Sequence, residues 1–110
     1  MGVEYQMHRA SVDTAKGFRQ FQKADNEFSK DNVDSAVTHL SKGLDCFSAA
    51  MDHIAKAEDD AYSKAGSEID QGNNEMRKSI DDYANGELDS GQRHYTKALD
   101  KYDEALDLID

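Results

Sequence analysis

Apolar residues recur along the chain at alternating steps of four and three, which is the period of an amphipathic helix. The clearest stripe predicts a helix of about 24 residues, and its members are Val33, Val37, Leu40, Leu44, Phe47, Met51 and Ile54. A second stripe has one polar member, Gln92, and consists of Leu88, Gln92, Tyr95, Leu99, Tyr102, Leu106 and Ile109. Weaker stripes of the same period, from Met7 to Phe28 and from Tyr62 to Tyr83, predict a further helix before each of these.

The second half of the sequence repeats the first at a spacing of 55 residues. The identical pairs are Ala10/Ala65, Gly17/Gly72, Lys23/Lys78, Asp34/Asp89, Ser35/Ser90, His39/His94, Lys42/Lys97, Leu44/Leu99, Asp45/Asp100, Ala50/Ala105, Asp52/Asp107 and Ile54/Ile109. Turn residues separate the helices of each half, at 29–32 and 84–87; Gly86 suits the left-handed position after a helix, and Asp31 or Asn32 suits an N-cap. We therefore predict an all-α protein in which two tandem helical hairpins, 1–55 and 56–110, form an up-down four-helix bundle, as a single domain over 1–110.

The junction between the halves contains neither glycine nor proline. Asp59 or Asp60 can cap a new helix, yet the apolar stripe also continues in phase through Tyr62 and Ala65. A turn near residues 56–60 gives a monomeric bundle, whereas a continuous helix gives a dimer that exchanges hairpins. We expect the turn, because a helix of roughly 50 residues is far longer than usual.

A row of small residues runs beside each of the two strong stripes, and its members are Ala36, Gly43 and Ala50, and Gly91, Ala98 and Ala105. Glycine inside a helix costs about 1 kcal/mol relative to alanine. Close approach of a neighbouring helix compensates such a cost, so we expect these rows to lie at helix–helix contacts.

The chain is acidic, with a net charge of −10 and a pI near 4.7. Phosphate backbones and anionic lipid surfaces are repelled by such a surface, so we expect neither nucleic acid nor membrane as a partner. No apolar run approaches the length of a membrane-spanning helix. Cys46 is the single cysteine, which excludes an internal disulfide and fits a cytoplasmic location.

Residues 85–91 (NGELDSG) and 94–99 (HYTKAL) resemble the turn and second helix of a tetratricopeptide repeat, and residues 31–36 and 42–44 resemble the same parts less closely. The resemblance covers a short part of each half. It implies a helical scaffold that binds peptides or partner proteins. The period of 55 residues, the longer helices and the missing proline depart from that family, whose repeat is about 34 residues.

The histidines are the candidate metal ligands. A di-iron bundle needs Glu-x-x-His, and here Tyr5, Ala36, Ala50 and Gly91 stand three residues before the four histidines. His39, Cys46 and His53 are seven residues apart along one helix, about 10 Å, so no two of them share an ion. His39 and His94 occupy equivalent positions, where we expect them to edge the small-residue row.

Folding the first hairpin at position 30.5 places His8 level with His53 and Met7 near Met51. Histidine and methionine together suit copper or haem, although Ser63 and Leu108 replace both histidines in the second half. A metal- or haem-binding bundle is therefore our alternative hypothesis.

No phosphate loop, nucleophile elbow or calcium loop is present. We expect no enzyme and no bound cofactor, and a protein that acts through a protein partner or through itself, as a possible homodimer.

Overall fold

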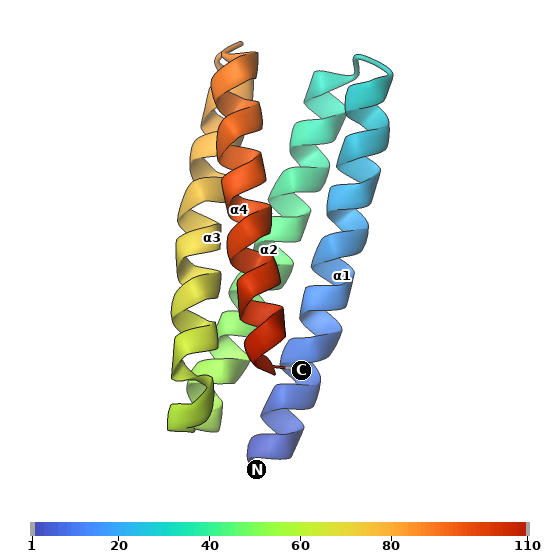
Figure 1. Ribbon diagram of the computed structural model, residues 1–110. Helices are drawn as coiled ribbons and strands as arrows, with labels where there is room; N and C mark the ends of the chain where they lie inside the picture. Colours follow the sequence, from blue (N-terminus) through green and yellow to red (C-terminus); the bar gives the residue numbers. More distant parts are fainter. Residues whose placement is uncertain (1, 110) are drawn as a thin grey trace.

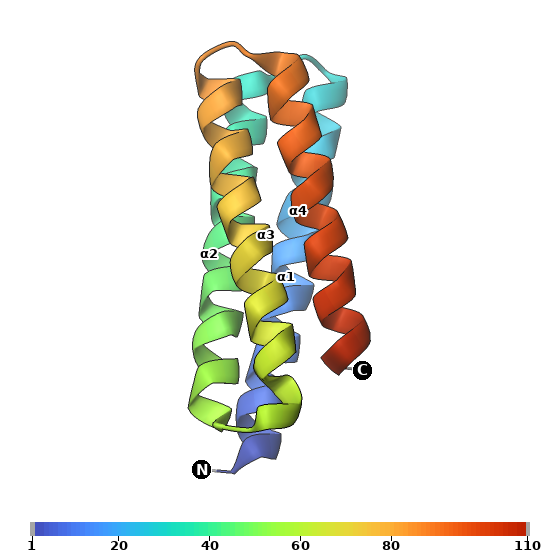
Figure 2. The ribbon, with the colours of Figure 1, turned by 60° about the vertical axis from the view of Figure 1, so that its left-hand side comes forward.

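Four helices joined by short turns make up the computed structural model, which describes residues 2–109 (Figure 1). The helices are α1 (Val3–Ser29), α2 (Val33–Ala57), α3 (Asp60–Ala84) and α4 (Leu88–Ile109). Successive helices run in opposite directions, and Figure 2 shows the same four from another side, aligned along one long axis. The predicted all-α, up-down four-helix bundle is confirmed.

The apolar stripes of the sequence point into the bundle. In α2 the residues spaced by seven, Leu40, Phe47 and Ile54, are at most 4% exposed, whereas Leu44 and Met51 between them are half-buried. The two rows of small residues are buried as well. The helix is stabilised mainly by burial of this one continuous face, because the intrinsic helix propensity of the residues is not enough on its own.

The two hairpin turns have the same geometry. Asp31 and Gly86, which are equivalent in the repeat, both adopt the left-handed conformation, with φ of 61° and 79°. In each turn the next residue donates its N–H to a carbonyl five residues back, Asn32 to Glu27 at 2.9 Å and Glu87 to Asp82 at 2.8 Å. This pattern is a Schellman cap. The prediction for Gly86 is confirmed, and Asn32 rather than Asp31 stands at the N-cap, without a capping side-chain bond.

The junction between the hairpins is a turn of two residues. α2 ends at Ala57, Glu58 takes the left-handed conformation with φ of 51°, and α3 begins at Asp60. Asp59 caps α3 because its Oδ1 accepts the N–H of Ala61 at 2.8 Å. The expected turn within 56–60 is therefore confirmed, and the described chain is not the continuous helix of the alternative.

Stacked aromatic rings join the two hairpins at the centre. The ring of Phe47 lies 3.8 Å from that of Tyr102, and Phe21 stacks 5.7 Å from each of them. The Tyr102 hydroxyl donates to Oδ1 of the buried Asn73 at 2.7 Å. Aromatic stacking of this kind adds to the free energy gained by burying the rings.

The four sides of the bundle are not equally closed. Among the described helices, close backbone approach joins α1 to α2, α2 to α3 and α3 to α4. The pair α1 and α4 is held instead by side chains, with the ring of Phe21 set edge-on against Tyr95 at 6.1 Å. The side between α1 and α4 therefore lacks the close backbone approach that joins the other neighbouring helices.

Candidate interaction surfaces

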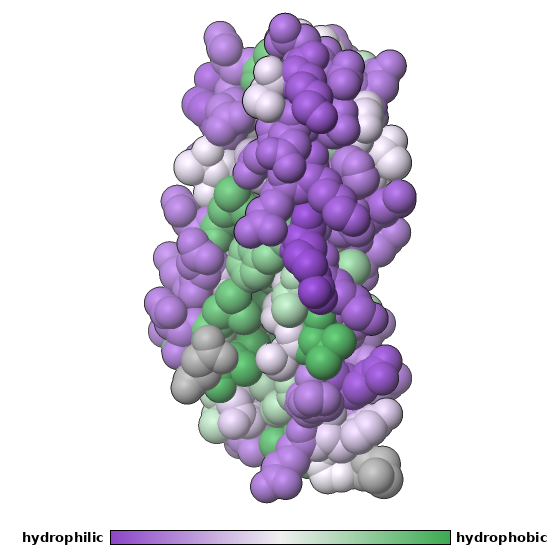
Figure 3. Space-filling model, turned by 90° about the vertical axis from the view of Figure 1, so that its right-hand side faces the viewer, coloured by the Kyte–Doolittle hydropathy of each residue, from purple (hydrophilic) through white to green (hydrophobic). Residues whose placement is uncertain are grey.

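An apolar groove runs between α1 and α4, and we call it the α1–α4 groove. It is an open groove of about 200 Å³, lined by Phe18, Phe21, Gln22, Asp25, Tyr95, Leu99 and Asp103. Figure 3 looks onto this side and shows a band of apolar side chains between the two helices, flanked by hydrophilic ones. Half-buried Phe18 and Leu99 expose part of their apolar surface there.

The rim of the α1–α4 groove is acidic. Asp25 and Asp103 lie on opposite sides, one on each helix. Asp25 accepts the hydroxyl proton of Tyr95 at 2.9 Å, and burial, together with the charge of Asp25, raises the pKa of Tyr95 far above its ordinary value. The tyrosine therefore stays protonated and donates its hydroxyl hydrogen to the Asp25 carboxylate.

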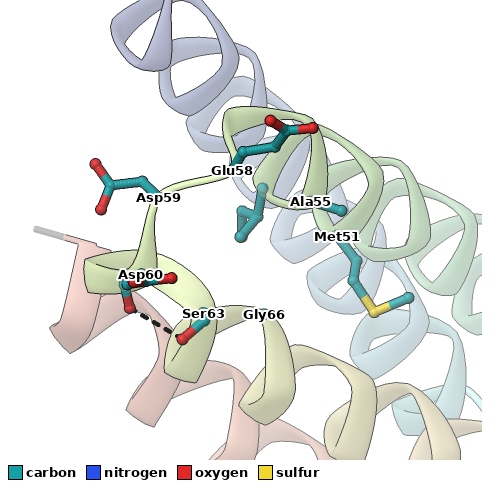
Figure 4. A pocket seen from close by; sticks show the side chains of 8 residues that line it. Met51, Ala55, Glu58, Asp59, Asp60, Ser63 and Gly66 are labelled. Carbon is teal, nitrogen blue, oxygen red and sulfur yellow. Dashed lines mark hydrogen bonds between the residues drawn. The ribbon is translucent and has the colours of Figure 1, made fainter.

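A second hollow, the α2–α3 pocket, lies beside the junction turn. It is an open hollow of about 560 Å³, lined by Met51, Ile54, Ala55, Glu58, Asp59, Asp60, Ser63 and Gly66. Figure 4 shows Met51 and Ala55 on α2 facing Ser63 and Gly66 on α3, with acidic side chains around the turn. Its size falls within the range of small-molecule sites.

The repeated histidines make equivalent bonds across each hairpin. His39 Nδ1 lies 2.9 Å from Oε1 of Gln20, and His94 Nδ1 lies 2.6 Å from Oε2 of Glu75. Because the amide and carboxylate oxygens accept, each ring donates from Nδ1. Glu75 stands where the first hairpin has Gln20. The histidine that occurs in both halves of the sequence thus forms a link between the two helices of each hairpin.

The proposed His8 and His53 cluster is arranged differently from the sequence hypothesis. His53 donates from Nδ1 to Oε1 of Gln6 at 2.8 Å, and its Nε2 lies 3.6 Å from Oδ2 of Asp13. His8 is exposed, Met7 is buried in the core and Met51 lines the α2–α3 pocket. Within residues 2–109 no group of three or more His, Cys, Asp or Glu side chains is placed to hold a metal ion. A copper or haem site at these four residues stays a prediction.

Cys46 is half-buried. Burial, and next the charge of Asp13, raise the pKa of its thiol. The thiol is therefore protonated at neutral pH and is a poor nucleophile.

Sequence reasoning missed both hollows. The signals that exist are local: Phe18 lies beside the predicted stripe of the first helix, and Glu58, Asp59 and Asp60 form an acidic run at the junction. Neither signal says which helices flank a cavity.

Comparison with protein families, with curated proteins and with solved structures finds no match to this chain. The tetratricopeptide resemblance therefore stays a prediction. Over residues 2–109, no helix is both long enough and apolar enough to cross a membrane.

Proposed function

We propose that this protein is a non-catalytic, cytoplasmic binding module that recognises a basic amphipathic helix of a partner protein in the α1–α4 groove. The observation that carries the proposal is the groove between α1 and α4. Apolar side chains line it, and each of the two helices contributes one carboxylate, Asp25 from α1 and Asp103 from α4. A helix laid in a hydrophobic groove is a common mode of peptide recognition. The tetratricopeptide resemblance also implies a partner protein.

Charge favours a partner over a second copy of the chain. The net charge of −10 makes two copies repel each other, whereas lysines on a partner helix meet Asp25 and Asp103. Leu99 and Phe18 supply the apolar contact between these charges. The groove thus combines the features that an amphipathic cationic helix needs.

A designed peptide tests the proposal directly. We would titrate the protein with a peptide of about five helical turns that carries leucines on one face and lysines on its flanks. We expect saturable binding, with nuclear magnetic resonance shifts concentrated on α1 and α4. The matched controls are a shuffled peptide of the same composition and a peptide with glutamates for the lysines, and equal binding of either control would overturn the proposal.

Variants locate the contact on the protein. Leu99→Gln removes apolar surface inside the groove and should weaken binding about tenfold, or about 1.4 kcal/mol. Leu88→Gln is the control, because Leu88 is 51% exposed and lies outside the groove. A light-scattering mass of twice the chain, with the same resonances broadened, would show self-association through this face and would contradict the partner model.

A further inference from the structure

Asp13 in α1 is a buried carboxylate at the contact between α1 and α2. It is 9% exposed, and its Oδ2 accepts no hydrogen bond from any described residue. Its one ion pair among residues 2–109 is with His53 in α2, at 3.6 Å, and the imidazole of that pair is charged only when it is protonated. A buried carboxylate oxygen without a partner costs free energy, so this position favours a bound cation.

The equivalent acid of the second hairpin has a lysine as its partner. In the repeat, Glu68 is equivalent to Asp13, and Lys101 is equivalent to Cys46. The ammonium group of Lys101 lies 3.5 Å from Oε2 of Glu68. Because Cys46 brings no positive charge, the first hairpin has the acid of this pair without its lysine. A cation at Asp13 would therefore do what Lys101 does for Glu68.

The second nitrogen of the His53 ring lies beside the Asp13 carboxylate. The first nitrogen, Nδ1, donates to Oε1 of Gln6 at 2.8 Å. That hydrogen bond fixes the tautomer, so Nε2 of the neutral ring carries the lone pair, 3.6 Å from Asp13 Oδ2. Hydrogen bonds of this kind orient the histidine ligands of metal ions.

The separation between His53 Nε2 and Asp13 Oδ2 suits a metal ion better than a shared proton. A charged N–H···O bond is about 2.7–2.9 Å long, and the 3.6 Å separation is too long for one. Two ligands at about 2.0–2.1 Å from a tetrahedral zinc ion are roughly 3.4 Å apart. Imidazole nitrogen and carboxylate oxygen are both established zinc ligands, so the pair has the right chemistry as well as the right spacing.

His94 in the second hairpin provides a contrast. Its Nε2 lies 3.8 Å from Oδ2 of Asp82, but that oxygen accepts the hydroxyl hydrogen of Ser90 at 2.6 Å. Its Nδ1 lies 2.6 Å from Oε2 of Glu75. The carboxylate oxygens beside His94 therefore already have donors, whereas Oδ2 of Asp13 has none among the described residues.

We propose that Asp13 Oδ2 and His53 Nε2 bind a zinc ion between α1 and α2, with Gln6 holding the imidazole in place. The part of the chain that the structure describes offers no group of three or more His, Cys, Asp or Glu ligands, so the protein supplies two ligands and solvent supplies the others. Solvent reaches the ion because the His53 side chain is 20% exposed. The site shares His53 with the one predicted from the sequence but does not use His8, and it lies outside the α1–α4 groove.

Zinc chloride is the probe, and the ring nitrogens of the histidines are the readout, in long-range proton–nitrogen correlation spectra at neutral pH. We expect a saturable, one-to-one change at Nε2 of His53, while Nδ1 keeps its proton. The rings of His39 and His94 are internal controls and should not change. Magnesium chloride should leave all rings unchanged, because Mg²⁺ prefers oxygen ligands. Failure of zinc to saturate His53, or saturation at another histidine instead, would overturn the proposal.

Variants identify the two ligands. Asp13→Asn keeps the shape of the side chain, His53→Gln removes the imidazole, and each should weaken zinc binding about tenfold or more. His8→Ala is the matched control and should bind zinc as the wild type does. Cys46→Lys introduces the lysine of the second hairpin, whose ammonium group should compete with zinc for Asp13. Helical circular dichroism checks that each variant is folded. Undiminished zinc binding by Asp13→Asn or His53→Gln, or its loss in His8→Ala, would contradict the proposal.

Discussion

The backbone of Gly72 in α3 lies against the ring of Tyr102 in α4, so closely that a Cβ on Gly72 would come within 2.6 Å of Tyr102 Cε1. The first hairpin has the same relationship between Gly17 and Phe47, also at 2.6 Å. These glycines therefore set the distance between the helices of each hairpin, and they place both rings in the central stack.

Gly72→Ala should lower the free energy of unfolding. The methyl group collides with a ring that is itself held by Phe21 and Phe47, at a cost of about 1–3 kcal/mol that exceeds the helix-propensity gain of about 1 kcal/mol. Urea denaturation measures the change. Gly66→Ala is the control in the same helix, because its new Cβ meets Ile54 Cγ2 at 3.3 Å, and it should cost less. Equal losses at both sites would contradict this account.

Asp31→Gly should stabilise the protein by about 0.5–1 kcal/mol, because Asp31 holds the left-handed conformation that glycine adopts without steric cost. The reverse exchange at the equivalent position, Gly86→Asp, should destabilise by a similar amount. Thermal unfolding followed by circular dichroism compares the two variants. Changes of the same sign at both turns would disprove the argument.

Acid should weaken the second hairpin more than the first. The hydrogen bond from His94 lowers the pKa of Glu75 despite partial burial, which opposes the shift. A lowered folded-state pKa means that the stabilisation is complete above the unfolded value of about 4.3 and is lost as pH falls through the folded value. The free energy of unfolding should therefore fall less steeply at acid pH in Glu75→Gln than in the wild type. In Gln20→Glu it should fall more steeply. Urea titrations between pH 3 and 7 test both, and an unchanged acid dependence would refute the link.

Alkali should destabilise the core through Tyr102. Burial raises the pKa of its hydroxyl well above the ordinary value. The folded-state pKa is raised, so the stabilisation is complete below the unfolded value of about 10 and is lost as pH rises above it. Tyr102→Phe should reduce this alkaline loss, at a cost of about 1–3 kcal/mol at neutral pH from the lost bond to Asn73. Tyr5→Phe is the control at an exposed position, and it should change neither the alkaline loss of stability nor the stability at neutral pH.

The helices and the hairpin turns were predictable because their causes are local. The period of apolar residues sets each buried face, and Gly86 marks a left-handed turn. The junction was harder to predict, since Glu58 takes a conformation that its side chain does not favour. The local signal that was available is Asp59, whose side chain caps the helix that follows.

The arrangement around His53 illustrates the limit of counting along helices. The observed pairs Gln20–His39 and Gln6–His53 lie symmetrically about position 29.5, one residue before the predicted centre. Moving the centre by one residue moves the position opposite His53 by two, from His8 to Gln6, and two residues correspond to a rotation of about 200° around the helix. Gln6 therefore meets His53, while His8 is exposed. The α1–α4 groove was unpredictable for a related reason, because periodicity does not say which two helices stay apart.

The two-residue link at Glu58 and Asp59 is the only covalent connection between two complete hairpins. Non-covalent contacts also hold the hairpins together, among them the stacking of Phe47 on Tyr102 and the hydrogen bond from Tyr95 to Asp25. Cleavage of the 58–59 peptide bond would leave each half with both of its helices and its own turn. The chain is thus organised as a tethered pair, in which the link raises the effective concentration of one half for the other.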